Sequence, residues 1–168
     1  MSAARATQRI ALLAALGALA SGCGFRLAGS EPLPAVMQRP YLSLQDSYTD
    51  FASEFERQLT DSGAHIVSAP QDASATVNIT RDEAQQRVLS VSGRNIPTEY
   101  ELTYTVTVSV SAGGHELMAP QPLSLTRDYS FEENRLLAKE HEVDVLRQQM
   151  ARELAAIVTR RLSSLKSP

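Results

Sequence analysis

The sequence predicts an α+β domain in which an antiparallel-rich sheet of about four strands carries two helices packed on one face. Three observations support this fold class. A strictly alternating strand pattern covers residues 101–110, several strand patterns follow one another with no helix between them, and two helix patterns with a single apolar stripe flank the set. One-sided helices and a one-sided sheet bury their apolar faces against each other, which leaves the second sheet face uncovered.

The first 22 residues have the features of an export signal. Arg5 and Arg9 precede an apolar run over residues 10–20, and no acidic residue is present. The run has about half of the ~20 residues that a membrane-spanning helix needs, so a cleaved signal peptide over 1–22 is expected. It ends in Leu-Ala-Ser-Gly-Cys, which resembles the bacterial lipobox. We therefore expect cleavage before Cys23 and attachment of lipid to this cysteine.

The surroundings of Cys23 agree with a lipid anchor. Cys23 is the only cysteine of the chain, so the exported protein forms no internal disulfide, and lipidation removes a free thiol from an oxidising compartment. Two or more acyl chains anchor a protein stably. In enteric-type sorting, Asp after the cysteine retains a lipoprotein at the inner membrane. Gly24 therefore favours the outer membrane, with the domain on the periplasmic side.

The charge of the mature chain argues against general binding of nucleic acid. Without residues 1–22 the chain has 14 basic against 19 acidic residues, a net charge of −5. Nucleic-acid binding generally needs a basic surface. We expect no nucleic-acid partner.

Residues 23–40 are expected to form a lipidated, extended tether. Pro32, Pro34 and Pro40 exclude a regular helix in this segment. A single domain over 41–168 is expected to follow it.

The domain begins with a strand pattern over 41–46 and a helix pattern. Ser47 is the expected N-cap of the helix, and Gly63 is the expected stop. The apolar stripe of the helix consists of Tyr48, Phe51, Phe55 and Leu59. Such a stripe is more typical of a helix packed on a sheet than of a ligand surface. A short strand over 65–69 is expected next.

The middle of the chain is rich in strand patterns. Alternation over 75–80 and 88–91 predicts strands, and the polar stretch 81–87 between them is a bend, a hairpin or an exposed strand. The clearest strand covers 101–110 and has a Thr-rich polar face. Its apolar face consists of Leu102, Tyr104, Val106, Val108 and Val110.

The last third of the chain predicts a turn, a strand and a long helix. Gly113 and Gly114 mark the turn, and alternation resumes over 123–129. Ser130 and Glu133 have capping-box spacing before a helical pattern that runs close to the end of the chain.

The sequence contains no recognisable catalytic motif. His115 and His141 are each followed by Glu, as in the zinc-protease motif H-E-x-x-H, but Ala119 and Val145 replace its second histidine. His65 is the only other histidine, and no second cysteine is present for a Cys/His zinc set. We expect no enzyme activity, no metal and no cofactor.

Three segments carry a family resemblance. They are Cys23-Gly24-Phe25-Arg26-Leu27, the stretch from Arg94-Asn95 to Glu99-Tyr100, and the stretch from Tyr129-Ser130-Phe131 through Leu137-Ala138-Lys139-Glu140 to Arg160-Arg161-Leu162. In order and spacing, over nearly all of the mature chain, they resemble the LptE family of lipopolysaccharide-assembly lipoproteins. The resemblance implies a non-enzymatic lipoprotein that assembles with and plugs the large outer-membrane barrel LptD and contacts lipopolysaccharide on its way to the cell surface.

The resemblance also implies a fold and a site. The family fold is a sheet with two helices on one face, and its uncovered polar face suits a polar barrel lumen. Lipopolysaccharide carries phosphates, with which Arg and Lys pair. By motif match, Arg94 in the turn before the central strand and Lys139 early in the last helix are the expected contacts. Weaker candidates are Arg81, Arg87 and Arg127.

Two other classes of function are alternatives. A pilotin-type chaperone of another outer-membrane complex would bind a secretin, but pilotins are mostly helical or built of short repeats, so the long alternating strand argues against it. A periplasmic enzyme would lose turnover when a particular His or carboxylate is replaced, and the lack of catalytic motifs argues against that class.

Overall fold

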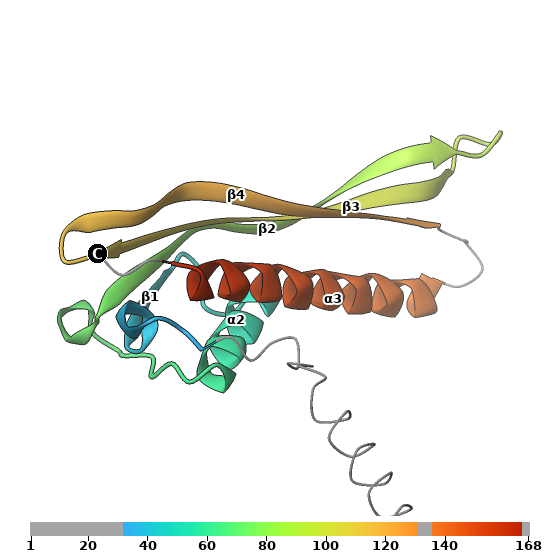
Figure 1. The fold of residues 1–168 in the computed structure, drawn as a ribbon. Helices are drawn as coiled ribbons and strands as arrows, with labels where there is room; N and C mark the ends of the chain where they lie inside the picture. Colours follow the sequence, from blue (N-terminus) through green and yellow to red (C-terminus); the bar gives the residue numbers. More distant parts are fainter. Residues whose placement is uncertain (1–31, 131–135, 166–168) are drawn as a thin grey trace, which may run out of the picture. The chain divides into compact units, whose positions relative to one another are not determined.

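A four-stranded sheet forms one layer of the domain and two helices form the other (Figure 1). The computed structural model describes residues 32–130 and 136–165, with side chains described from residue 142 onward in the second range. The strands are β1 (Pro40–Leu44), β2 (Ala75–Val91), β3 (Pro97–Ala112) and β4 (His115–Ser130), and the helices are α2 (Asp50–Asp61) and α3 (Leu136–Ser163). The predicted α+β fold class, mostly antiparallel and with two helices, is confirmed.

The sheet has the strand order β1-β2-β3-β4. β1 runs parallel to β2, whereas β2, β3 and β4 form an antiparallel meander of long strands. The stretch 81–87, which the sequence left open, is an exposed continuation of β2. Because β1 pairs with β2 only as far as Ile79, the rest of β2 has β3 alone as a neighbour. Gly113 and Gly114 form the predicted turn between β3 and β4, both with positive φ.

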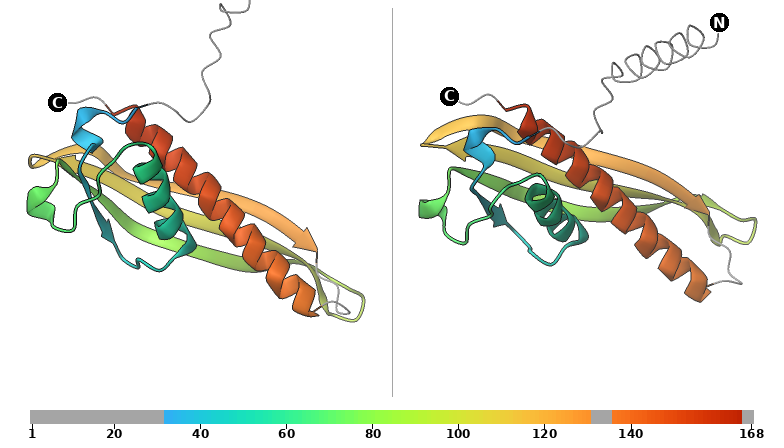
Figure 2. Two further views of the ribbon diagram at one scale, coloured as in Figure 1. Left: turned by 90° about the horizontal axis from the view of Figure 1, so that it is seen from below. Right: turned by 60° about the horizontal axis from the view of Figure 1, so that its bottom comes forward.

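Both helices lie on the same face of the sheet, side by side (Figure 2). The amide of Gln58 on α2 donates a hydrogen bond of 3.2 Å to the backbone carbonyl of Arg152 on α3. The opposite sheet face carries no helix within the described residues. The two layers therefore leave one polar sheet face open, as the sequence predicts.

The start of α2 differs from the sequence prediction. Thr49, not Ser47, is the N-cap, and its hydroxyl accepts a hydrogen bond of 3.0 Å from the backbone N–H of Ala52. Tyr48 precedes the helix and is 94% exposed, so it does not belong to the apolar stripe. The helix ends before Gly63, whose φ of +91° confirms it as the stop.

One further local prediction is wrong, and another lies partly outside the described residues. The segment 65–69 is not a strand, since only Val67 forms an isolated bridge, to Tyr41. Ser130 is the last residue of β4, and Glu133, its partner in the predicted capping box, lies outside the described residues. At 65–69 the pairing of distant strands decides the structure, and local patterning carries no information on that pairing.

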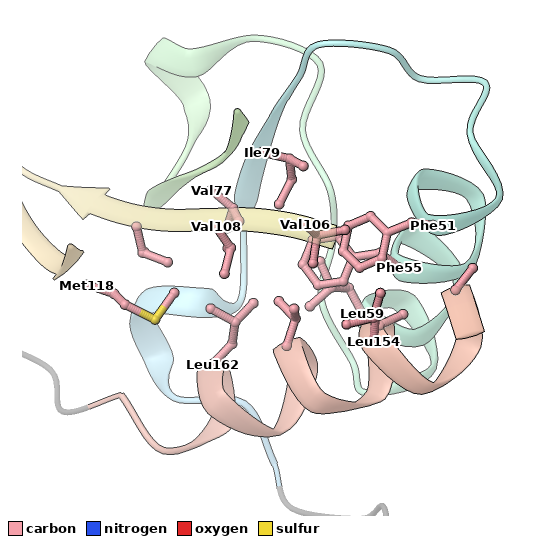
Figure 3. Close-up of a cluster of buried hydrophobic side chains, with 14 of the residues drawn as sticks. Phe51, Phe55, Leu59, Val77, Ile79, Val106, Val108, Met118, Leu154 and Leu162 are labelled. Carbon is pink, nitrogen blue, oxygen red and sulfur yellow. The ribbon is translucent and has the colours of Figure 1, made fainter. Parts of the chain in front are cut away.

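The core lies between the sheet and the two helices (Figure 3). Its fully buried side chains include Phe51, Phe55 and Leu59 from α2, Val77, Val106 and Val108 from the sheet, and Leu154 and Leu162 from α3. Leu33 and Met37 are also buried there, so the segment expected to be a tether contributes side chains to the core. Burying each of these large side chains stabilises the fold by about 1.5–3 kcal/mol.

Candidate functional site

The uncovered sheet face is a hydrogen-bonded polar surface. Residues that are directly opposite in an antiparallel pair share a face. Thr103 lies opposite Thr126 and Thr105 lies opposite Ser124, and these hydroxyl pairs are 3.3 and 2.8 Å apart. Thr105 is buried among its neighbours although no helix covers it. The face therefore presents polar groups that already satisfy part of their hydrogen bonding within the sheet.

Most charges on this face are paired with each other. Arg81 forms an ion pair with Glu83 along β2. Arg87 forms two hydrogen bonds, of 2.6 and 3.0 Å, with the carboxylate of Glu101 on β3, and these bonds lower the pKa of Glu101. Arg127 lies on the opposite, helix-covered side and bonds Glu153 of α3 at 2.8 Å. The three weaker candidate arginines are thus on one sheet, but Arg127 does not share a face with the other two.

Arg94 lies at the tip of a projecting arm. We call residues 90–98, the end of the β2–β3 hairpin, the β2–β3 arm. β4 ends at Ser130, opposite Glu99, so among the described residues the arm beyond this point is two-stranded (Figure 1). Its turn is closed by a 2.7 Å hydrogen bond from the Ser92 N–H to the Ile96 carbonyl.

The Arg94 side chain is exposed, and it makes no ion pair with any residue in the described ranges. Lys139 is in the first turns of α3, among residues whose side chains are not described. The start of α3 and the β2–β3 arm lie at the same end of the domain in Figures 1 and 2. The fold therefore brings the two backbone positions predicted from the family motifs to one end.

A part-buried polar cluster beneath the sheet was not predicted from the sequence. Asp82 of β2 accepts hydrogen bonds from the hydroxyls of Thr49 and Tyr104. Burial raises the pKa of Asp82, and burial together with the Asp82 carboxylate raises the pKa of Tyr104. Arg147 of α3 bonds Asp50 at 2.7 Å beside this cluster. The sequence does show Asp82, but its place in the cluster can be inferred only once residues 81–87 are known to form a strand.

The structure offers no metal site or membrane span in the parts that it describes. No group of three or more His, Cys, Asp or Glu side chains is placed to hold a metal ion there. None of the described helices is long and apolar enough to cross a membrane. Cys23 lies outside the described residues.

Comparison with known proteins identifies the family of this chain. The sequence profile of the LptE lipopolysaccharide-assembly family matches residues 37–162. The LPS-assembly lipoprotein LptE of Yersinia pestis (strain Pestoides F) is 31% identical over 157 residues, which cover 91% of this chain and 74% of that protein.

Two solved structures have the same fold. An uncharacterized lipoprotein B from Nitrosomonas europaea matches with a TM-score of 0.70 and 27% identity, over 84% of this chain and 91% of that one. The rare lipoprotein B from Shewanella oneidensis matches with a TM-score of 0.66 and 26% identity, over 75% of this chain and 94% of that one. The chain belongs to the LptE family of lipopolysaccharide-assembly lipoproteins.

Proposed function

We propose that this chain is an outer-membrane lipoprotein that assembles with and plugs an LptD-like β-barrel and contacts lipopolysaccharide during its export. The observation that carries this proposal is the open polar sheet face, opposite a fully packed helical layer, in a member of the LptE family. The protein acts by binding, and no catalytic step is assigned to it.

The chemistry of the open face suits the lumen of a barrel. Lumens of large outer-membrane barrels are polar, so a plug needs groups that exchange hydrogen bonds with the wall. Thr103 and Thr126 offer such groups, and the Arg87–Glu101 pair is already neutral as a unit. A charge that is paired before docking costs less to desolvate than an unpaired charge when the wall excludes water.

The end of the domain that carries the β2–β3 arm is the proposed lipopolysaccharide contact. Arg94 is exposed there without a carboxylate partner in the described chain, so its guanidinium is available to a phosphate. Lys139 lies at the same end by its backbone position. Two cations from different elements would hold the phosphates of lipid A or core.

The lipid anchor belongs to the same proposal. Cys23 lies nine residues before Pro32, where the described chain begins, so the anchor and the packed domain are close in sequence. Metabolic labelling with palmitate should label the wild-type chain and not Cys23→Ser. The Cys23→Ser variant should leave the outer-membrane fraction, and its retention there would contradict the anchor.

An affinity purification of the tagged, lipidated chain from detergent-solubilised membranes tests the barrel partner. We expect a stoichiometric LptD-like barrel, identified by mass spectrometry. A secretin in its place would support the pilotin alternative. Recovery of no barrel in gentle detergent would overturn the proposal.

The lipopolysaccharide contact has a separate test. Arg94→Glu and Lys139→Glu should each weaken binding of purified lipopolysaccharide to the chain while the barrel still co-purifies. Arg160→Glu is the matched control, because Arg160 is exposed near the other end of α3. Equal loss in all three variants would indicate a nonspecific charge effect and contradict the site.

A further inference from the structure

The two edge strands, β1 and β4, are protected against pairing with another strand. The part of β2 that extends beyond the end of β1 is not protected. β1 is only five residues long, and the Val67 N–H donates to the Pro40 carbonyl on its outer side. β4 carries Pro120 and Pro122, which lack the N–H that strand pairing needs. Short strands and prolines are the usual protection of sheet edges.

We call the unprotected part, Arg81–Val88 on the side away from β3, the open β2 edge. It contains neither Pro nor Gly, and register irregularities bound it on both sides, after Ile79 and after Val88. No strand lies beside it within 32–130 and 136–165. A regular strand with a bare edge presents unpaired N–H and C=O groups at every second residue.

Exposed apolar side chains flank the open β2 edge at both ends. The structure describes five large apolar side chains as exposed, and four of them are here: Tyr48, Val88, Leu89 and Val91. Tyr48 is at the β1 end, because its neighbour Thr49 bonds Asp82 of the edge. The other three are at the arm end, 42–52% exposed. These side chains offer apolar surface that a partner strand on the open β2 edge would cover.

We propose that the open β2 edge binds an extended segment of the barrel partner's own polypeptide, which adds a strand to the sheet. The edge accommodates about eight residues, with apolar side chains at both ends to contact Tyr48 and Val88 and polar ones between them. This inference rests on the proposed function, because it names the barrel as donor of the strand.

The charged side chains along the edge are already paired within the sheet, so the backbone of the edge defines the partner. Arg81, Glu83, Gln85 and Arg87 alternate with the helix-side residues and so share the uncovered face. Arg81 pairs with Glu83, and Arg87 pairs with Glu101 on β3, so no cation of this row is left without a carboxylate. Only a polypeptide backbone matches the alternating donors and acceptors of the edge, so a lipid is the weaker candidate.

Backbone hydrogen exchange of the full lipidated chain, alone and in its barrel complex, tests the proposal. Peptides that span Arg81–Val88 should exchange at least about tenfold more slowly in the complex, since new hydrogen bonds protect the open amides. Peptides from the outer edge of β4 should change little. A barrel complex with unchanged exchange over Arg81–Val88 would overturn the strand addition and leave the proposed function standing. Absence of any barrel complex overturns both, and equal protection by lipopolysaccharide alone overturns the strand addition.

A pair of proline variants separates strand addition from simple burial. Successive N–H groups point to opposite sides of a strand. One of the two variants Ala84→Pro and Gln85→Pro therefore removes an N–H on the open side of β2. The other removes an N–H that pairs with β3. The variant that keeps wild-type thermal stability should bind the barrel about tenfold more weakly. Ala119→Pro, at an exposed alanine of the β4 edge, is the matched control and should bind normally. Wild-type affinity of the stable edge proline would contradict the inference.

Discussion

The phenolic hydroxyl of Tyr104 donates a hydrogen bond to Oδ1 of Asp82 on the neighbouring strand, at 2.8 Å. The same hydroxyl accepts a bond of 3.3 Å from the backbone N–H of Phe51, in the first turn of α2. Thr49, the N-cap of α2, bonds the other oxygen of Asp82. One carboxylate and one phenol therefore join β2, β3 and the start of α2, at the point where β2 extends past the end of β1.

Tyr104→Phe should lower the free energy of unfolding by about 1–2 kcal/mol. The substitution removes one donor and one acceptor and leaves part-buried polar groups without partners. Urea denaturation measures the effect. Tyr48→Phe is the same chemical change at a 94% exposed side chain and should be neutral. Equal effects of the two variants would contradict a structural role for the Tyr104 hydroxyl.

The stability contribution of Asp82 should increase as the pH falls. Burial, and to a smaller extent the charges of Asp46 and Asp50, raises the pKa of Asp82 above its ordinary 3.8, despite the opposing hydrogen bonds. The folded state then binds this proton more tightly than the unfolded chain does. Protonation of Asp82 therefore increases the free energy of unfolding as the pH falls from above the raised pKa towards the ordinary pKa of 3.8.

Urea titrations of the wild type and Asp82→Asn between about pH 7 and pH 4 check this sign. As the pH falls, the free energy of unfolding of the wild type should increase relative to that of the Asp82→Asn variant. A shift in favour of the variant would show that hydrogen bonding from Thr49 and Tyr104 outweighs burial and lowers the pKa instead.

Thr49→Ala should destabilise the protein by about 0.5–2 kcal/mol, the range for loss of an N-cap. It removes the acceptor for the Ala52 N–H and the donor to Asp82. Ser47→Ala removes a similar hydroxyl two residues earlier, outside the helix, and should be nearly neutral. Thermal unfolding compares the stability of the two variants directly. A larger loss of stability for Ser47→Ala than for Thr49→Ala would indicate that Ser47 is the N-cap.

Phe55→Ala should cost about 3–5 kcal/mol, because it leaves a cavity between α2 and the sheet. Phe55 stacks on Phe51 with ring centroids 5.3 Å apart, so the loss includes an aromatic pair. Tyr48→Ala deletes another aromatic side chain outside the core and should change stability little. A comparable loss for Tyr48→Ala would mean that this side chain belongs to the apolar stripe after all.

Residue periodicity was enough to predict the class of the fold and the faces of its central strand. Strict alternation between Leu102 and Val110 assigns each side chain to a face, because the side-chain period of a strand is two. The stripe of Phe51, Phe55 and Leu59 likewise fixed the buried side of α2. Motif resemblance determined the family, and it supplied Arg94 and Lys139 as candidates that simple periodicity does not identify.

The pairing of the strands, and the residue at which each pairing stops, could not be predicted from residue patterns. The polar stretch 81–87 has no apolar alternation of its own, and it is extended because β3 supplies a complete ladder of backbone partners beside it. The N-cap moved from Ser47 to Thr49 because Asp82, more than thirty residues away, accepts the threonine hydroxyl. Both outcomes depend on hydrogen bonds between distant segments, whose energy is gained only after the chain has folded, so local sequence patterns do not encode them.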